Sequence, residues 1–201
     1  MIIKIILSAV IAYLLGSVNS SILVGRIYGK DIRKFGSGNA GLTNTLRVFG
    51  KKAAFFVLLG DVSKGVIACI VSAILIDPDI FPAYVIGGLF AVVGHNWPIY
   101  FRFKGGKGAL TAVSAAFMID PVSASILIAV FIAVLLISRY VSLATMMAGL
   151  LYPVISLIIT GNIHIFIYSL LIMMMIIYRH RSNIRRLINN EEPKINLRTQ
   201  R

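Results

Sequence analysis

The stretch YVSLATMMAGLLYPVISLIITGNIHIFIYSLLIMMMIIY, residues 140–178, contains no Lys, Arg, Asp or Glu in 39 positions. A single helix needs about 20 apolar residues to cross the hydrocarbon core of a bilayer, so this stretch is long enough for two. Gly161-Asn162 lies in its middle and is a turn signal. We therefore predict two spanning helices, Tyr140–Thr160 and Ile163–Tyr178.

The whole chain shares the apolar character of this stretch. Of its 201 residues, 58% are hydrophobic and 13% are charged, whereas a soluble domain is roughly 45–50% apolar and 25% charged. So few charges cannot cover a water-facing surface, which excludes a cytosolic enzyme, a secreted disulfide scaffold and a disordered chain. We predict an all-α integral membrane protein, a single transmembrane domain over residues 1–201 that forms a bundle of about seven transmembrane helices. The five further segments are Ile5–Gly25, Ala53–Ile76, Ile80–Phe101, Gly108–Ile119 and Pro121–Ser138.

The excess of Lys and Arg, which gives a formal net charge of +13, is concentrated in alternate connections between these segments. In a soluble protein this charge would suggest nucleic acid, but cytoplasmic loops of membrane proteins carry surplus Lys and Arg. The basic connections are residues 26–52, 102–107, 138–140 and 179–201, and the acidic or neutral ones are 77–79, 120–121 and 161–162. This alternation predicts an outside N-terminus, a cytoplasmic C-terminus and no nucleic-acid partner.

Two features depart from a simple apolar span. The segment Gly108–Ile119 has 12 residues, which reach only about 18 Å as a helix. It either includes the polar Lys107-Gly108 end or is a partial span that faces protein. Asp61 and Lys64 are three residues apart within the second segment. Because isolated charges are costly in hydrocarbon, we interpret them as a structural ion pair.

The first basic connection contains FGSGNAGLTNTLRVFGKK, residues 35–52. Glycines let the backbone approach a ligand and adopt positive φ, and successive N–H groups in such a turn form a concavity that binds anions. An arginine beside them can hold a phosphate with two hydrogen bonds. The pattern predicts a phosphate site, and the alternative is a polar interfacial loop with glycines for turning. The candidate residues are Gly36, Ser37, Gly38, Asn39, Thr43, Asn44 and Arg47, with Gly41 as a third turning glycine.

The second basic connection reads FRFKGGKGALT, residues 101–111, and an apolar helix is predicted directly after it. A helix start offers unpaired N–H groups and the positive end of a dipole, which suit a phosphate. The spacing does not match the GxxxxGK[ST] pattern of nucleotide-binding loops. A basic loop that only sets topology is the alternative to a second phosphate site. The candidate residues are Lys104, Gly105, Gly106, Lys107 and Gly108.

A third polar cluster is divided between two places in the sequence. Ser142 begins the helix predicted after the basic turn at residue 139, and His180 and Asn183 follow the last span. Because His180 and Asn183 are three residues apart, we expect them to share a helix face. His180 is a candidate acid, base or phosphate donor, and the alternative is a basic helix end that only reaches the lipid headgroups. His95 is interpreted as a satisfied helix-end histidine.

The sequence offers little to hold a metal or a cofactor. The acids on the predicted cytoplasmic side are Asp31, Glu191 and Glu192, which are too few and too scattered to hold Mg²⁺ among phosphates. Cys69 is the one cysteine, so no internal disulfide and no thiolate cluster are expected. We therefore expect no metal site and no cofactor, and chemistry on a phosphorylated, lipid-soluble substrate that depends on positioning and charge neutralisation.

Together these stretches resemble the PlsY family, the bacterial acyl-phosphate-dependent glycerol-3-phosphate acyltransferases. The similarity extends from the first span to the tail, with the same order and spacing. The matching stretches are Gly36-Ser37-Gly38-Asn39-x-Gly41-x-Thr43-Asn44-x-x-Arg47, Asp61-x-x-Lys64-Gly65, Gly94-His95 with Pro98, Phe103-Lys104-Gly105-Gly106-Lys107-Gly108, Arg139-Tyr140-x-Ser142, and Arg179-His180-Arg181-x-Asn183-Ile184-x-Arg186-Leu187.

The resemblance implies transfer of a fatty acyl group from acyl phosphate to the 1-hydroxyl of sn-glycerol 3-phosphate, which gives lysophosphatidic acid and phosphate. This is the first acylation of bacterial phospholipid synthesis, in the cytoplasmic membrane, with active-site loops at residues 26–52, 102–108, 138–142 and 179–192. The implied partners are glycerol 3-phosphate, acyl phosphate, membrane lipid and PlsX, the soluble acyl-phosphate synthase, although the residues themselves do not indicate docking. The implied catalytic residues are Ser37, Arg47, Ser142, His180 and Asn183, and residues 104–108 match the family's glycerol-phosphate motif. Glu192 aligns with a glutamate linked to structural integrity.

The sequence leaves alternatives for the general base and for the function. The general base is either His180 or a phosphate oxygen of the substrate itself. Asn190 stands where the family has glycine, and asparagine tolerates left-handed backbone. The rival functions are a transporter or channel for an organic phosphate and a purely structural membrane protein. Against the transporter, the outer halves of the spans are apolar and only the predicted cytoplasmic face is polar.

Overall fold

The computed structural model describes residues 1–77 and 83–195, and within these ranges every regular element is a helix. The chain divides into two compact units, Met1–Ile119 and Asp120–Arg201. Residues 78–79 of the predicted acidic turn at 77–79, the start of the Ile80–Phe101 segment and the last six residues lie outside the described ranges. The first unit contains α1 Ile2–Ser17, α2 Ser20–Ile27, the 3-10 helix η1 Ile32–Lys34, α3 Leu42–Leu75, α4 Ala83–Asn96, the 3-10 helix η2 Ile99–Phe101 and α5 Ala109–Ile119. The second contains α6 Pro121–Ser138, α7 Val141–Thr160, α8 Ile163–Arg179 and α9 Arg181–Ile188.

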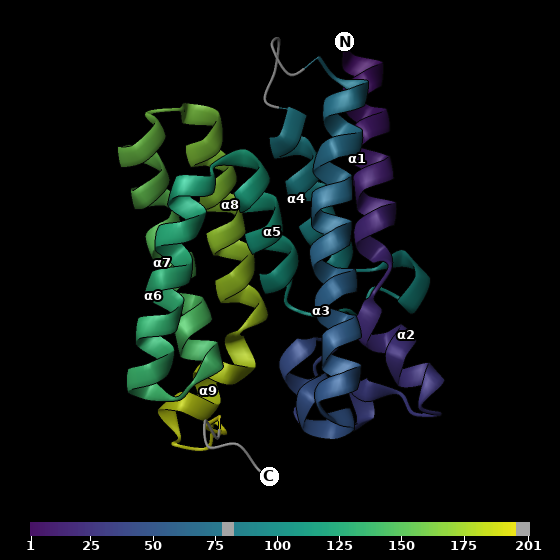
Figure 1. Cartoon of the computed structure of the whole chain (residues 1–201), viewed down its shortest axis with the longest axis vertical. Helices are drawn as coiled ribbons and strands as arrows, with labels where there is room; N and C mark the ends of the chain where they lie inside the picture. The colour runs from purple at the N-terminus through teal and green to yellow at the C-terminus, as the bar shows by residue number, and fades with distance from the viewer. Residues whose placement is uncertain (78–82, 196–201) are drawn as a thin grey trace. The chain divides into compact units, whose positions relative to one another are not determined.

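The first unit is built on α1, α3 and α4, which lie side by side, with α5 packed against α3 and α4 (Figure 1). Small residues form these contacts: a Cβ on Gly16 would collide with the backbone of Ala91, and one on Gly94 would collide with the carbonyl of Tyr13. Close backbone approach through small residues is the usual way in which helices associate in a membrane. Many of the larger apolar side chains, among them Ile3, Phe55 and Ile74, are exposed on the remaining surface.

The first predicted segment, Ile5–Gly25, is not one continuous helix. Helix α1 ends at Ser17 and α2 begins at Ser20, because Val18 and Asn19 adopt extended backbone. The side chain of Asn19 accepts a hydrogen bond from the N–H of Ile22, 3.0 Å away, and so caps the second helix. The stretch Gly16-Ser17-Val18-Asn19-Ser20-Ser21 is polar at the break, but none of these residues is charged, so a division of the chain at its charged residues does not separate the two helices.

The first basic connection contains more helix than expected. Helix α3 begins at Leu42, so Thr43, Asn44 and Arg47 lie on its first turns and not in a loop. Gly50 interrupts the helix with φ 82° and ψ −174°, and the long apolar part follows this kink. A glycine explains the kink because it adopts positive φ without steric cost.

Helix α5 resolves part of the question about the fourth segment. It has 11 residues, about 16 Å of helix, which is roughly half the thickness of the hydrocarbon core. Thr111, Ala112, Ser114, Ala115 and Ala116 are buried within the unit. This length and burial agree with the alternative of a partial span that faces protein.

The second unit confirms the division predicted for the uncharged stretch. Helix α7 ends at Thr160, Gly161 adopts a left-handed conformation with φ 59°, and α8 begins at Ile163. Asn162 caps α8 by accepting hydrogen bonds from the N–H groups of His164 and Ile165. The start of α6 uses the same device, because Asp120 caps it and Pro121 occupies its first turn.

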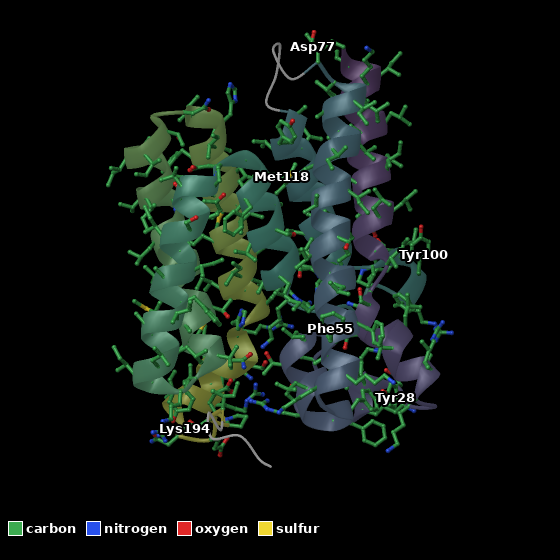
Figure 2. The ribbon with its side chains drawn as sticks, viewed as in Figure 1. Tyr28, Phe55, Asp77, Tyr100, Met118 and Lys194 are labelled. Atoms are coloured by element: carbon green, nitrogen blue, oxygen red, sulfur yellow. The ribbon has the colours of Figure 1, made fainter. Side chains whose placement is uncertain are left out.

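The length and composition of the helices agree with an integral membrane protein. Four described segments are long and apolar enough to cross a bilayer, Ile2–Ile27, Leu42–Leu75, Pro121–Ser138 and Val141–Thr160, and the pair α8 and α9 makes a fifth if its 56° bend is one broken span. The count of seven spans, the orientation of the termini and the single domain stay predictions. Figure 2 shows Asp77 and Tyr28, from an acidic and a basic connection, near opposite ends of the first unit, as strict alternation requires.

Candidate active site

Asn44 organises the first glycine-rich loop from its position on α3. Its side chain is buried, and its carbonyl oxygen accepts a hydrogen bond from the N–H of Ser37 at 2.9 Å. Its amide nitrogen lies within hydrogen-bond distance of three carbonyl oxygens, those of Ile32, Phe35 and Asn39. One asparagine therefore holds the backbone on both sides of Ser37. Asn44 was predicted to bind substrate; that role stays a prediction, and the structure shows that it shapes the loop.

Two of the three predicted turning glycines adopt left-handed backbone. Gly36 has φ 56° and Gly38 has φ 73°, on either side of Ser37. A Cβ on Gly36 would also collide with the side chain of Asn44. The expectation fails for Gly41, which has φ −164° and ordinary extended backbone because it is the residue that precedes α3. Ser37 is thus presented by two glycine turns and one asparagine.

The side chains expected to contact a ligand in this loop differ in exposure. Ser37 and Arg47 are exposed, whereas Asn39 and Thr43 are half-buried. All four lie within the stretch that Asn44 and the start of α3 hold in place. The four candidate side chains of the first loop therefore lie on one continuous segment, from Ser37 to Arg47 on the first turns of α3.

The second glycine-rich loop is packed tightly against the end of α4. The N–H of Gly106 donates to the carbonyl of His95 at 3.1 Å, and a Cβ on Gly105 would collide with that same carbonyl. A Cβ on Gly106 would collide with the ring of His95 and the carbonyl of Ala40. Gly108 has φ 75°, and α5 begins at the next residue, as predicted. Lys104 is exposed and Lys107 half-buried at the start of this helix.

An ion pair that the sequence analysis did not select connects the two loops. The guanidinium of Arg33 lies 2.8 Å from the carboxylate of Asp31 and donates to the carbonyl oxygens of Phe101 and Lys104 at 3.3 and 3.2 Å. The hydrogen bond from Arg33 lowers the pKa of Asp31 from 3.8 to about 2. The residue pair is recognisable as Asp-x-Arg in the sequence, but its partners are 68 and 71 residues away.

The second unit gathers its candidates around Glu192. One carboxylate oxygen of Glu192 accepts hydrogen bonds from the hydroxyl of Ser142 and the side-chain amide of Asn183, both at 2.6 Å. The other oxygen accepts from the guanidinium of Arg186 at 2.7 Å. Burial alone would raise the pKa of Glu192, but these three hydrogen bonds outweigh burial and lower it below its usual value of 4.5. Ser142 and Asn183 are thus brought together, 41 positions apart in the sequence, by a residue that the sequence analysis placed outside its catalytic set.

His180 lies at the junction between α8 and α9 and is buried. Its Nδ1 is 2.8 Å from the carbonyl oxygen of Ile176. Because a carbonyl only accepts, Nδ1 carries a proton, and in the neutral ring the lone pair is on Nε2. Asn183, three residues later, is buried in the same unit on the first turn of α9. The 56° bend between the two helices falls at His180, so the pair lies at a helix junction and not on a single straight helix.

The predicted ion pair inside the membrane is confirmed. Lys64 Nζ lies 2.9 Å from a carboxylate oxygen of Asp61, and both side chains are buried. His95, interpreted as a satisfied helix-end histidine, is the third member of this group, with Nδ1 2.8 Å from Lys64 Nζ. Among residues 1–77 and 83–195, no group of three or more His, Cys, Asp or Glu side chains is arranged to hold a metal ion.

Comparison with known proteins agrees with this arrangement. The family described as Glycerol-3-phosphate acyltransferase matches residues 6–190. The proteins named glycerol-3-phosphate acyltransferase from Macrococcus caseolyticus and Thermoanaerobacter pseudethanolicus are 44% and 39% identical over 193 and 196 residues, which cover 96% and 97% of this chain and 97% and 98% of theirs.

Solved structures match the fold. The glycerol 3-phosphate form of PlsY (YgiH), an integral membrane glycerol 3-phosphate acyltransferase, superposes with a TM-score of 0.89 at 34% identity and covers 96% of both chains. The lysophosphatidic acid form of the same protein gives a TM-score of 0.86 at 33% identity and covers 96% of this chain and 95% of its own. This chain is therefore an integral membrane acyltransferase that belongs to the PlsY-type glycerol-3-phosphate acyltransferase family.

Proposed function

We propose that the chain transfers a fatty acyl group from acyl phosphate to the 1-hydroxyl of sn-glycerol 3-phosphate in the bacterial cytoplasmic membrane. The hydroxyl oxygen attacks the acyl carbonyl carbon, the bond from that carbon to the phosphate oxygen breaks, and the hydroxyl proton leaves to a base. The products are lysophosphatidic acid and inorganic phosphate, and the reaction is the first acylation of phospholipid synthesis. PlsX, the soluble acyl-phosphate synthase, is the proposed source of the donor.

The observation that supports the proposal most strongly is the Lys104–Gly108 loop at the start of α5 in a chain of this family. The loop places two lysines and the N–H groups of a helix start beside each other, a combination suited to a phosphate. A relative of this fold has been solved in a glycerol 3-phosphate form and in a lysophosphatidic acid form, the proposed acceptor and product.

The proposed roles follow from the chemistry of each side chain. Arg47, Lys104 and Lys107 neutralise the phosphates of the two substrates, which otherwise repel each other. Ser37, Ser142 or Asn183 was expected to donate to the carbonyl oxygen as it gains negative charge. Ser37 is the proposed donor, because the one hydroxyl proton of Ser142 and one amide N–H of Asn183 are already donated to Glu192. The remaining substrate-binding surface is formed by the backbone of Gly36, Gly38, Gly105, Gly106 and Gly108, with Asn39 and Thr43. Asn44 contributes to it by holding the first loop in place. Because acyl phosphate is already activated, no covalent intermediate on the enzyme is needed.

We propose two candidates for the general base that accepts the hydroxyl proton. His180 has the tautomer that a base requires, because Nδ1 donates to the carbonyl of Ile176. A phosphate oxygen of glycerol 3-phosphate is the other candidate. His180→Gln separates them: with the histidine as base, kcat falls roughly a hundredfold or more and the rise of activity with pH disappears. An unchanged rate and pH profile would assign the proton to the substrate phosphate.

The proposal is tested with purified protein in lipid, labelled glycerol 3-phosphate and no added metal. Acyl phosphate, acyl-CoA and an acyl carrier protein thioester are offered in separate reactions. Labelled lysophosphatidic acid from acyl phosphate alone is the expected result. Product from a thioester and none from acyl phosphate would overturn the proposed donor. Uptake of label into sealed vesicles with no product from any donor would instead favour a transporter.

A further inference from the structure

Three titratable side chains form a buried cluster in the first unit, and none of them has a part in the proposed reaction. Asp61, Lys64 and His95 are 1%, 6% and 3% exposed. Asp61 and Lys64 lie on α3, within a segment apolar enough to span the membrane, and His95 lies near the end of α4. Ionisable groups at such a depth are costly and are usually partners of one another or functional.

Lys64 is at the centre of the cluster. Its ammonium lies 2.9 Å from Asp61 Oδ1, 2.8 Å from His95 Nδ1 and 3.0 Å from the carbonyl oxygen of Val18. An ammonium has three N–H donors and no acceptor, so these three partners use all of them. Nδ1 of His95 must therefore accept, and the proton of the neutral ring is on Nε2.

The far side of the His95 ring faces the second glycine-rich loop. A Cβ on Gly106 would collide with Nε2 of His95 and with the carbonyl of Ala40, so both atoms lie directly against Gly106. The backbone of the same histidine contributes as well, because its carbonyl accepts from the N–H of Gly106 at 3.1 Å. The orientation of one imidazole thus defines where Gly106, between Lys104 and Lys107, can lie.

The other side of the cluster holds the segment that supports the first loop. The hydroxyl of Ser20 donates to Asp61 at 3.0 Å, and Val18, whose carbonyl accepts from Lys64, is at the break between α1 and α2. Asn19, between them, donates from its side-chain amide to the carbonyl of Ala40 at 3.4 Å. Ala40, in the first loop, is therefore connected to the cluster in two ways. Its carbonyl accepts from Asn19, and the same carbonyl lies with the ring of His95 against Gly106.

Stability alone does not explain this arrangement. A buried ion pair is often no more stable than apolar side chains of similar volume, because desolvation offsets the attraction. Its hydrogen bonds are directional, however, and they select a single arrangement of the segments that carry them. These segments are the α1–α2 break, α3, the end of α4 and, through the hydroxyl of Thr111 at 3.3 Å from the carbonyl of Asp61, the start of α5.

We propose that Asp61, Lys64 and His95 are positioning residues that set the two glycine-rich loops in register for glycerol 3-phosphate. This inference rests on the proposed function, since it assigns the acceptor to these loops. It makes His95 act through Gly106 and Ala40 and not by contact with the substrate.

The test is His95→Gln in purified protein in lipid, with KM for each substrate, kcat and thermal stability measured together. The expected result is a KM for glycerol 3-phosphate raised roughly tenfold to a hundredfold, since loss of positioning by about 1 Å has effects of this size. KM for acyl phosphate should rise by a smaller factor, because His95 lies directly against Gly106, between the two lysines of the loop matched to glycerol 3-phosphate. His164→Gln, an exposed histidine in the second unit, is the matched control and should leave all constants unchanged. An unchanged KM with a smaller amount of folded enzyme would show a merely structural role and overturn the inference.

A milder variant keeps the test decisive if His95→Gln does not fold. Ser20→Ala removes one hydrogen bond to Asp61 and retains all three charged or titratable groups. It should raise KM for glycerol 3-phosphate roughly threefold to fivefold, and no change would count against the cluster.

Calorimetric titration of glycerol 3-phosphate, without any acyl donor, separates this inference from the proposed reaction. Weaker binding to the variants than to the wild type supports positioning, whichever acyl donor the wild type uses. Equal binding of glycerol 3-phosphate to the wild type and to the variants overturns the positioning role, even where wild-type acyl transfer is normal. Absence of acyl transfer from acyl phosphate by the wild type overturns the proposed reaction alone.

Discussion

The two units place their candidate residues by opposite means. In the first unit the loops depend on glycines, which have no side chain. Neighbouring groups pack so closely against Gly36, Gly105 and Gly106 that a Cβ at these positions would collide with them. In the second unit a single carboxylate, Glu192, gathers three donors by attraction. The first arrangement leaves no room for an added methyl group, whereas the second fails when the carboxylate acceptor is lost. The difference predicts which substitutions damage each unit.

The largest effect is expected from Gly106→Ala. The added methyl group would collide with the ring of His95 and the carbonyl of Ala40, so the loop must move away from its position. We expect kcat/KM to fall at least roughly a hundredfold, as for a misplaced binding group. Gly29→Ala is the control, since that glycine has φ 68° but open space around its Cβ position. Equal losses in both variants would show that the collision is not responsible, since Gly106 lacks the positive φ that strains an alanine at Gly29.

The next effect in size is expected from Glu192→Ala. Its removal leaves the buried donors of Ser142 and Asn183 without their shared acceptor, which should cost about 3 kcal/mol of stability. Thermal unfolding in lipid or detergent measures the change, and activity should fall with it because both donors lose their orientation. Glu191→Ala, at the exposed neighbour, should leave the unfolding temperature unchanged. If the two variants behave alike, Glu192 does not organise the second unit.

The pH dependence of stability sharpens the same comparison. Because the pKa of Glu192 is lower in the folded protein than its usual 4.5, its contribution is present above about pH 4.5 and is lost as pH falls through the folded value. Asp31, with a pKa of about 2 against 3.8, contributes above about pH 4 and loses this as pH falls toward 2. Unfolding temperatures recorded from pH 7 to pH 3 should decline less steeply for Glu192→Gln than for the wild type. Parallel curves would contradict the assigned role of the carboxylate.

The smallest effect is expected from Asp31→Asn. The substitution removes the charge that orients Arg33 toward the carbonyls of Phe101 and Lys104, but the pair is partly exposed and therefore screened by solvent. We expect KM for glycerol 3-phosphate to rise roughly twofold to threefold, which is the scale of a partly exposed ion pair. Asp77→Asn, in an acidic connection, serves as the control. A loss of kcat/KM as large as that expected for Gly106→Ala would mean that the hydrogen bonds of Arg33 to the second loop matter as much as the close packing of Gly106.

Much of the fold follows from local patterns in the chain. An uncharged stretch of 39 residues with Gly161-Asn162 in its middle predicts two helices, and the helices end and begin at Thr160 and Ile163. Glycines before an apolar run predict a turn followed by a helix, and α5 begins directly after Gly108. Asparagine, which stands where the family has glycine at residue 190, tolerates left-handed backbone, and Asn190 has φ 59°. In each case the determining forces act over a few residues: hydropathy, capping and the steric limits on φ.

Local patterns were least informative where the partner of a polar side chain is distant. The break at Val18-Asn19 involves a cap by Asn19 and a hydrogen bond from Lys64, which is 46 positions away in the sequence. Asn44 was predicted to bind substrate, and its role in holding the first loop was not predicted, because a sequence does not distinguish a buried amide from an exposed one.

Composition and spacing thus establish a helical membrane protein with phosphate-suited loops, because bilayer thickness and backbone sterics act on every residue alike. Which groups hold those loops was decided by the tertiary structure. His95 meets Lys64 across 31 positions, and Ser142 meets Glu192 across 50. Such contacts depend on how whole helices pack, and a hydrogen bond forms only where packing brings donor and acceptor within about 3 Å of each other.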